Sequence, residues 1–432
     1  MSAFTPIKKL DVFRCLTDNS KVLVGQLAQN QQGVFFQYNA DYLTTHQSLS
    51  PFSVPFNDTL KKAPNQPHQG LQGLFADSLP DGWGMLLMDR IFRQQSIQPQ
   101  HVSAMDRLAY IGDSGIGALS YHPVIDWKNK AEDWIDLDVL GQQATQVFDG
   151  DADIVLTALA NAGGSGGARP KALIYLNPQE NNQVSTTASK GLEPWLVKFT
   201  SQNLLLGHDE GLCEAAYLTM AKQTGIDVPE WQLFTPKNIK TNNKNGSKAW
   251  LATKRFDCSD EGGRYHTQTL CGLLDADFRQ PSLDYEDCIK ASQTLCNSPA
   301  EGQRQFTRAI FNLFADNQDD HTKNWSFLVD DKGQWQVAPF YDVTFSPNPH
   351  QQHMMAYAGY GTQPPKKAIQ TLAAHANYAS WKKAQVEIEK VVEALSSWTS
   401  IAKELDIKPS IIKLIAKQLD EVYRQNKGLL DR

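Results

Sequence analysis

Residues 317–342 read Asn317-Gln318-Asp319-Asp320-His321-Thr322-Lys323-Asn324, then a mainly apolar stretch around the turn Asp330-Asp331-Lys332-Gly333, then Pro339-Phe340-Tyr341-Asp342. The apolar residues on either side of the turn predict a β-hairpin. Asp319 and Asn324 are five positions apart, and Asp342 follows the hairpin. One interpretation is a polar helix end at which an Asp and an Asn cap the backbone. Another is a site that uses these three side chains together.

The order and spacing of the three residues favour the second interpretation. Phosphoryl transfer requires an acceptor for the proton of the substrate hydroxyl and oxygen ligands for Mg²⁺. Kinases place a catalytic Asp and a metal-binding Asn five positions apart, with a second metal-binding Asp further along the chain. Asp319 is therefore the candidate catalytic base, and Asn324 and Asp342 are the candidate Mg²⁺ ligands. Asp320 is an alternative base, although the spacing to Asn324 favours Asp319.

A glycine-rich segment, residues 163–171, is a second candidate part of such a site. It matches neither GxxxxGK[ST] nor GxGxxG. Glycines let backbone N–H groups approach phosphate oxygens closely and form an anion-binding nest. The plainer interpretation is a flexible loop. The candidate ATP contacts in this segment are Ser165, Gly166, Gly167, Ala168, Arg169 and Lys171.

Lys198 lies in the otherwise apolar stretch 195–199, which is typical of a β-strand. A lysine is unfavourable to bury unless it meets an anion. The phosphates of ATP would satisfy it, and Glu214 on the next predicted helix, residues 209–224, would orient it. The alternative is a lysine on an edge strand that reaches solvent.

Three short features complete the list of candidates. Lys254 and Phe256 lie in residues 251–257, where a strand between two lobes would offer backbone groups to adenine. His321 and Lys323 belong to the 319–324 segment and are further candidates for the ATP site. His321 could instead ligate a metal, although a histidine in such a place more commonly braces a loop through hydrogen bonds.

The periodicity of the chain predicts an α+β protein with two lobes and a cleft between them. Alternating residues predict strands over 22–27, 33–38 and 172–176, and helical spacing predicts helices over 83–91 and 151–162. Residues 107–121 suggest a loop that leads into a strand. Beyond residue 257 the pattern is helical apart from the hairpin. We expect an N-terminal domain over 1–145, a β-rich lobe over 146–257 and an all-α lobe over 258–432.

Composition limits the classes of function. The 432 residues carry a formal net charge of -6, so the chain as a whole is not a nucleic-acid binder by charge. It has no apolar run long enough to span a membrane and no secretory signal. The six cysteines include no CxxC pair, which disfavours a zinc site or a disulfide framework. We expect a cytoplasmic protein.

Taken together, the motifs resemble the HipA family nearly from end to end. They are residues 75–84 (FADSLPDGWG) and 111–119 (IGDSGIGAL) in the N-terminal part, 165–171 (SGGARPK) in the middle, and 317–324 (NQDDHTKN) with 339–342 (PFYD) near the end. The resemblance implies a protein-kinase-like fold with a β-rich N-lobe, an all-α C-lobe and a Ser/Thr kinase activity dependent on ATP and Mg²⁺. Ser165 matches the serine that this family autophosphorylates, with loss of activity.

The resemblance also implies partners. The family pairs with a small helix-turn-helix antitoxin dimer of the HipB type, binds operator DNA through that complex and represses its own operon. Its known substrate class is an aminoacyl-tRNA synthetase, whose phosphorylation arrests growth.

Two other functions compete with the kinase toxin. A catalytically inactive scaffold would act only as a corepressor with the antitoxin, and the complete set of Lys198, Asp319, Asn324 and Asp342 argues against it. A small-molecule kinase uses a similar loop from Asp to Asn, and the extension over residues 1–150 argues against it.

Overall fold

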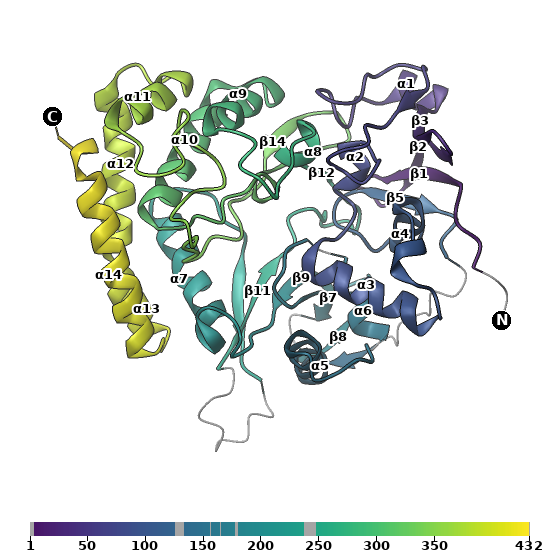
Figure 1. Ribbon diagram of the computed structural model, residues 1–432, viewed down its shortest axis with the longest axis horizontal. Helices are drawn as coiled ribbons and strands as arrows, with labels where there is room; N and C mark the ends of the chain where they lie inside the picture. The colour runs from purple at the N-terminus through teal and green to yellow at the C-terminus, as the bar shows by residue number, and fades with distance from the viewer. Residues whose placement is uncertain are drawn as a thin grey trace.

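The structure is a computed structural model that describes residues 4–125, 134–155, 157–164, 166–177, 180–236 and 248–431. Figure 1 shows the helices of the C-terminal part gathered at one end of the molecule and the N-terminal part at the other. The sheet strands β7, β9 and β11 lie between them. This arrangement confirms the predicted α+β, two-lobed, kinase-like fold.

A five-stranded antiparallel sheet, in the order β4-β3-β2-β1-β5, forms the centre of the N-terminal part. Alternate residues such as Leu10 and Val12 are fully buried, which is the pattern of a sheet with one covered face. Its elements are β1 (Lys9–Cys15), β2 (Lys21–Asn30), β3 (Gly33–Tyr38), α1 (Ala40–Thr45), β4 (Lys61–Lys62), α2 (Gly73–Ala76), α3 (Gly82–Gln94), α4 (Ala104–Ile111) and β5 (Leu119–His122).

A six-stranded sheet, in the order β10-β11-β9-β7-β8-β6, forms the middle part. Helix α5 packs closely on it, because a Cβ added at Gly141 would lie 2.4 Å from the ring of Trp250 on β11. The elements are β6 (Ile135–Asp136), α5 (Leu137–Asp149), α6 (Thr157–Asn161), β7 (Lys171–Asn177), β8 (Glu180–Ser185), β9 (Glu193–Lys198), α7 (Glu210–Gln223), β10 (Trp231–Phe234) and β11 (Trp250–Lys254).

The C-terminal part is helical apart from a small sheet, β12-β13-β14. The predicted hairpin is β13 and β14, and β12 adds a strand that the sequence analysis did not predict. The elements are β12 (His266–Thr269), α8 (Leu270–Leu273), α9 (Tyr285–Leu295), α10 (Pro299–Phe314), β13 (Ser326–Val329), β14 (Trp335–Val337), α11 (Lys366–His375), α12 (Trp381–Ser396), α13 (Trp398–Glu404) and α14 (Pro409–Asn426).

Two hydrophobic clusters hold these parts together. The first runs from Leu10 to Ala252 and includes Val329, so the N-terminal sheet and the middle sheet share one core. The second runs from Leu206 to Leu429 and joins α7 to the C-terminal helices. Helix α7 is buried along most of its length because it lies between the middle sheet and those helices. The cleft between the two clusters is where side chains from all three parts can meet.

Two secondary-structure predictions were wrong. Residues 151–155 are not helical, because α5 already ends at Gly150, which has a left-handed φ of 85°. The apolar residues of α5, among them Leu140, Ala144 and Val147, have helical spacing that the sequence analysis overlooked. Residues 107–111 belong to helix α4 rather than to a loop, and a capping box between Ser103 and Asp106 starts that helix. No helix among the described residues is long and apolar enough to cross a membrane.

Candidate functional site

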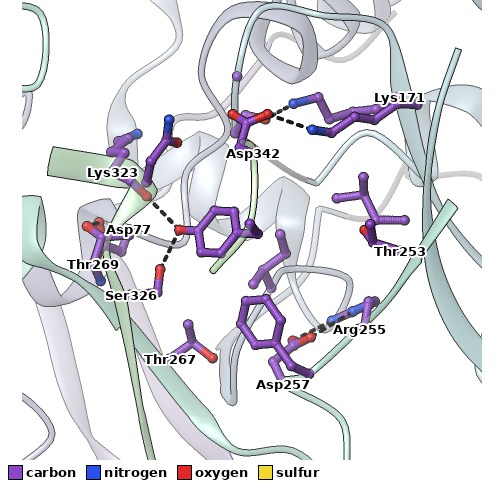
Figure 2. A pocket seen from close by; sticks show the side chains of 18 of the residues that line it. Asp77, Lys171, Thr253, Arg255, Asp257, Thr267, Thr269, Lys323, Ser326 and Asp342 are labelled. Carbon is purple, nitrogen blue, oxygen red and sulfur yellow. Dashed lines mark hydrogen bonds and ion pairs between the residues drawn. The ribbon is translucent and has the colours of Figure 1, made fainter. Parts of the chain in front are cut away.

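A cavity lies where the middle sheet faces the β12-β13-β14 sheet and the segment 321–326. Figure 2 shows Lys171 and Asp342 on one side of it and Arg255 and Asp257 on another. Its apolar wall includes Leu196, Leu218 and Phe256. Four lysines also line the cavity, namely Lys171, Lys198, Lys254 and Lys323. Carboxylates such as Glu214 and Asp342 lie beside these lysines, so the cavity joins an apolar region to a region of mixed charge.

Lys198 is the centre of the region of mixed charge. Its ammonium nitrogen lies 2.6 Å and 2.8 Å from the two carboxylate oxygens of Glu214 and 2.6 Å from Oδ1 of Asp342. The ion pair expected between Lys198 and Glu214 is therefore present, and Asp342 joins it from the far side of the cleft. Burial alone would lower the pKa of Lys198, but Asp342 and Glu214 outweigh it and the pKa is raised. The lysine stays charged at neutral pH.

Asp342 is held in an uncommon backbone conformation. Its φ is +56°, the left-handed region that residues with a side chain rarely adopt. The neighbouring Tyr341 ties this turn to the 321–324 segment, because its hydroxyl donates to the carbonyl of Lys323 at 2.7 Å and lies 2.6 Å from Ser326 Oγ. Burial would raise the pKa of the Asp342 carboxyl, but Lys198 and then Lys171 hold it far below its ordinary value. Asp342 is therefore an anion.

Asp319 and Asp320 are adjacent but lie in different surroundings. The Asp320 carboxylate is buried and accepts hydrogen bonds from the Tyr285 hydroxyl at 2.5 Å and the Met354 amide at 2.7 Å, with His353 Nδ1 2.8 Å away. The Asp319 side chain keeps 59% of its surface exposed. Only Asp319 has an accessible oxygen that could accept a proton from a substrate, and its placement favours it over Asp320 as the base.

The surroundings of Asp319 also suit a proton acceptor. Partial burial raises the pKa of its carboxyl above the ordinary value, and Asp342 adds to this rise, whereas His321 opposes it. His321 Nε2 lies 3.8 Å from Asp319 Oδ1, and the His321 ring packs edge-on against Phe278. Asn324 donates from Nδ2 to the carbonyl of Asp319 at 2.9 Å, which leaves its side-chain oxygen for another partner.

The glycine-rich segment reaches the cavity in part. Gly164, Gly166, Gly167 and Lys171 line it, and Lys171 donates to the carbonyl of Gly166 at 2.8 Å. Ala168, Arg169 and Asp319 are not among the residues that line it. Arg169 pairs instead with Glu210 at 2.7 Å. Ser165, the predicted autophosphorylation site, lies outside the described residues.

Lys254 and Phe256 line the cavity at the end of β11, and so does Arg255 between them. The backbone N–H groups of Lys254 and Arg255 donate to the carbonyls of Glu230 and Pro194. These two groups are therefore not available to adenine, which differs from our expectation for a lobe-connecting strand. Phe256 packs near Tyr341, with ring centroids 5.5 Å apart, and the two rings offer an aromatic surface instead.

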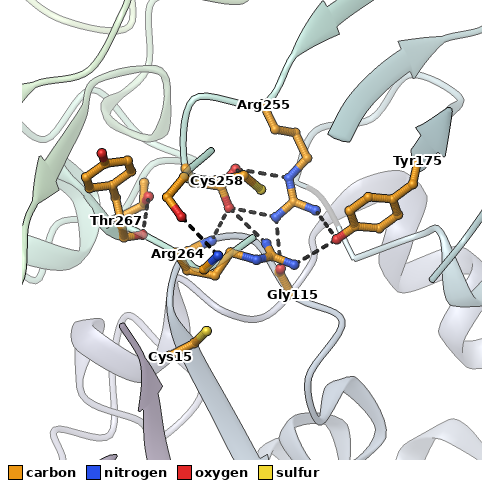
Figure 3. Close-up of polar contacts among 12 residues, drawn as sticks. Cys15, Gly115, Tyr175, Arg255, Cys258, Arg264 and Thr267 are labelled. Carbon is orange, nitrogen blue, oxygen red and sulfur yellow. Dashed lines mark hydrogen bonds and ion pairs between the residues drawn. The ribbon is translucent and has the colours of Figure 1, made fainter. Parts of the chain in front are cut away.

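A buried charge network fixes this end of the cavity (Figure 3). Arg255 binds Asp257 in a bidentate manner, at 3.0 Å and 2.6 Å. Arg264 Nη1 lies 3.3 Å from the same carboxylate and donates from Nη2 to the Tyr175 hydroxyl at 2.8 Å, while the amide of Gly117 donates to Asp257 at 2.7 Å. The network joins the N-terminal part, the middle sheet and the connection to the C-terminal part.

The sequence analysis missed several residues of the cavity wall. Asp77 and Asp81 come from the N-terminal part, and Arg255, Asp257 and Tyr341 come from the segments around the candidates. The signal for the first two was the Pro80-Asp81-Gly82 turn within the 75–84 motif, which we used only for the resemblance. Within the described residues, no group of three or more His, Cys, Asp or Glu side chains is arranged to hold a metal ion.

The two lobes, the buried Lys198–Glu214 pair and the facing Asp342 define the class, a protein with a kinase-like fold. Comparison with known proteins narrows it. The family model for the HipA-like C-terminal domain matches residues 163–399, more than half of the chain, and the model for the HipA N-terminal domain matches residues 18–122. The chain therefore belongs to the HipA family of toxin kinases.

Individual relatives agree with this assignment. The chain is 25% identical over 346 residues to "Putative kinase Y4mE" of Sinorhizobium fredii, covering 74% of each chain. It is 27% identical over 184 residues to "Putative kinase Y4dM" of the same organism, covering 41% of this chain and 43% of that protein. The HipA chain in the complex of Shewanella oneidensis HipA and HipB with operator DNA superposes with a TM-score of 0.65 at 16% identity, over 97% of this chain and 96% of that one. This last match shows a shared fold.

Proposed function

We propose that this protein is an ATP- and Mg²⁺-dependent serine/threonine protein kinase. The proposal rests on the contacts of Lys198. Its ammonium group bonds the carboxylate of Glu214 on α7 and the carboxylate of Asp342 across the cleft. A buried lysine between two carboxylates can replace one of these carboxylates with a nucleotide phosphate as its anionic partner. The accessible Asp319 carboxylate then lies near the point where a substrate hydroxyl would enter.

The residues of the chain divide the work. Lys198, oriented by Glu214, binds the ATP phosphates. Gly166, Gly167 and Lys171 bind them from the glycine-rich segment, and Lys323 binds them from residues 319–324, which we call the catalytic segment. Asp319 accepts the proton as the serine or threonine oxygen attacks the γ-phosphorus and ADP departs. Burial raises the pKa of the Asp319 carboxyl, which makes it a better proton acceptor than an ordinary aspartate.

The donor set near Asp319 fits Mg²⁺. The free side-chain oxygen of Asn324 and the ionised Asp342 carboxylate are hard oxygen ligands of the kind that this ion prefers. When bound there, Mg²⁺ would neutralise phosphate charge. Asp342 also bonds Lys198, so the proposed metal would share this carboxylate with the lysine.

The substrate and the regulation follow from the family. We infer that the chain phosphorylates an aminoacyl-tRNA synthetase and thereby arrests growth, and that it autophosphorylates on Ser165. A phosphate on Ser165 would add nearly two negative charges beside Gly166 and Gly167, where the ATP phosphates belong, so it would oppose nucleotide binding.

The partner follows from the structural relative, which is a complex of HipA, HipB and operator DNA. We infer that this chain binds a HipB-like antitoxin dimer and helps to repress its own operon through the DNA that the dimer binds. The net charge of -6 fits a chain that joins DNA through a partner.

Labelling of the purified full-length chain with [γ-³²P]ATP tests the activity. We expect labelling at Ser165 that requires Mg²⁺ and disappears in Asp319→Ala. Labelling that persists in Asp319→Ala would refute the assigned base. The absence of both labelling and MgATP binding in the dephosphorylated wild type would refute the kinase proposal and favour a corepressor scaffold.

A further inference from the structure

The 80–83 turn of the N-terminal part docks on the glycine-rich segment. The amide of Trp83 donates to the carbonyl of Gly167 at 3.0 Å, and the Trp83 indole donates to the carbonyl of Lys171 at 2.8 Å. The contact is close, because a Cβ added at Gly82 would lie 2.7 Å from Ala168 Cα. Trp83 itself is 1% exposed. The turn is therefore packed against residues 167–171, and Asp81 within it lines the cavity.

Asp81, within this turn, contacts both phosphate-facing segments at once. Its Oδ1 accepts a hydrogen bond from the amide of Gly167, and its Oδ2 pairs with Lys323 at 2.8 Å. Lys323 also lies over the ring of Phe278, 4.4 Å from its centroid, so the ion pair and the ring together restrict the position of the lysine. One carboxylate thus joins the glycine-rich segment to the catalytic segment.

The electrostatic state of Asp81 suits this role. Burial would raise the pKa of its carboxyl, but Lys323 and the amide of Gly167 outweigh burial and lower the pKa below its ordinary value. Asp81 is therefore an anion at neutral pH. A half-buried, charge-assisted contact of this kind is stronger than a contact at an open surface.

We propose that Asp81 is a positioning residue for the nucleotide: it holds residues 166–171 in place at the cavity and orients Lys323 toward the phosphates. This inference rests on the proposed kinase function. It makes the N-terminal part a component of the nucleotide site, because neither of the kinase lobes supplies Asp81. The two donors that Asp81 holds, a glycine amide and a lysine, are of types that also bind phosphate, so removal of a carboxylate that blocked the site would lower KM.

Three substitutions separate the two contacts of Asp81. Asp81→Asn keeps an oxygen for the Gly167 amide and removes the charge opposite Lys323. Asp81→Ala removes both contacts, and Asp81→Glu keeps the charge on a longer side chain. The matched control is Asp89→Asn in helix α3, which begins directly after Asp81. The partly buried Asp89 carboxylate pairs with Arg107 at a distance of 2.7 Å, and Asp89 is not among the residues that line the cavity.

The experiment measures kcat and KM for MgATP, the thermal midpoint and amide hydrogen exchange on the full-length chain. We expect Asp81→Asn to raise KM about threefold to tenfold and Asp81→Ala to raise it about tenfold or more. The value of kcat should change less than KM, since Asp319 is untouched. Asp81→Glu should recover part of the loss. In a Lys323→Met background Asp81→Asn should add less than about twofold, because the pair is already broken.

Several results would overturn the inference. One is an unchanged KM for MgATP in Asp81→Ala. Another is a lower KM in Asp81→Ala, which would mean that Asp81 competes with phosphate. The third is a rise of KM in Asp89→Asn that equals the rise in Asp81→Asn. Amide exchange does not depend on activity, and residues 166–171 should exchange faster in Asp81→Ala than in the control. If the wild type is inactive but this exchange difference is present, the kinase proposal is rejected and the positioning role of Asp81 is kept. If residues 166–171 exchange equally fast in Asp81→Ala and in the control, that role is rejected.

Discussion

Adjacent aspartates in this protein have unlike roles because their neighbours differ. Asp320 points inward and receives hydrogen bonds from Tyr285 and from the backbone of Met354, so it fixes the shape of the catalytic segment. Asp319 points outward and is largely exposed. The spacing to Asn324 favoured Asp319 from the sequence alone, but the burial of Asp320 could not be read from it, because its partners lie 34 and 35 positions away.

The first prediction contrasts these two residues. Asp319→Asn should fold normally and lose about 100-fold to 10,000-fold in kcat, since it removes the proton acceptor. Asp320→Asn should lower the free energy of unfolding by about 2–4 kcal/mol, because its amide group would face donors that now meet an oxygen. Denaturant unfolding and steady-state kinetics on both variants check this. A stable, inactive Asp320→Asn would reverse our assignment.

The second prediction concerns pH. Because the pKa of Asp319 is raised, kcat/KM should fall on the acid side at a pH above that of an ordinary aspartate, as the base becomes protonated. His321 lowers the pKa of Asp319, so His321→Gln should move this acid limb to higher pH. The exposed His350→Gln serves as the control and should leave the limb in place. A shift to lower pH in His321→Gln would contradict the electrostatic account.

At the scale of elements, most of the site was predictable because local patterns carry it. The apolar stretch of β9 around Lys198, the helix α7 with Glu214 and the hairpin before Asp342 are all visible in the sequence. Asp81 was not identified as part of the site because its partner Lys323 is 242 positions away and nothing in the periodicity links the two. The sequence also could not show that the amides of Lys254 and Arg255 are already hydrogen-bonded, since these bonds depend on where the carbonyls of Glu230 and Pro194 lie.

The third prediction concerns the Arg255–Asp257–Arg264 network at the end of β11. Asp257→Asn should lower the free energy of unfolding at pH 7 by about 3–5 kcal/mol, since it leaves Arg255 buried without its partner. Burial favours protonation of Asp257, but the two arginines hold its pKa far below the ordinary value. Its contribution is therefore present at neutral pH and is lost as the pH falls below about 4.

Denaturant midpoints measured between pH 7 and pH 3 check this prediction. The variant should show a weaker acid dependence than the wild type. Asp260→Asn is a matched control, because Asp260 is exposed and three positions away, and it should change stability by less than about 0.5 kcal/mol. Equal stability of Asp257→Asn and Asp260→Asn would contradict the structural role of the network.

At the scale of the whole molecule, the N-terminal part and the middle sheet are joined by a common core. They share a hydrophobic cluster, in which Trp83 of α3 packs near Phe148 of α5 with ring centroids 6.3 Å apart. The sequence analysis predicted three ranges from changes in periodicity, and these boundaries remain a prediction. The shared core could not be foreseen, because an apolar stripe on α3 does not say which sheet will cover it.

The fourth prediction follows from that shared core. A chain that begins at residue 134 loses α3, which packs on α6, and loses the N-terminal side of the shared hydrophobic cluster, so it should not unfold cooperatively. Near-ultraviolet circular dichroism and amide exchange on the truncated and full-length chains check this. A truncated chain with the thermal midpoint of the full chain would show that the two parts fold independently.

The most direct test of phosphoryl transfer by this cleft is the intact mass of the full-length protein. The chain is first treated with phosphatase, freed of the enzyme and then incubated with MgATP. The wild type should gain the mass of one phosphate, and Asp319→Asn treated in parallel for the same short time should show at most about 1% of this gain, in line with its lower kcat. A wild type that binds MgATP but gains no mass, or an Asp319→Asn variant that gains as much as the wild type, would contradict this account.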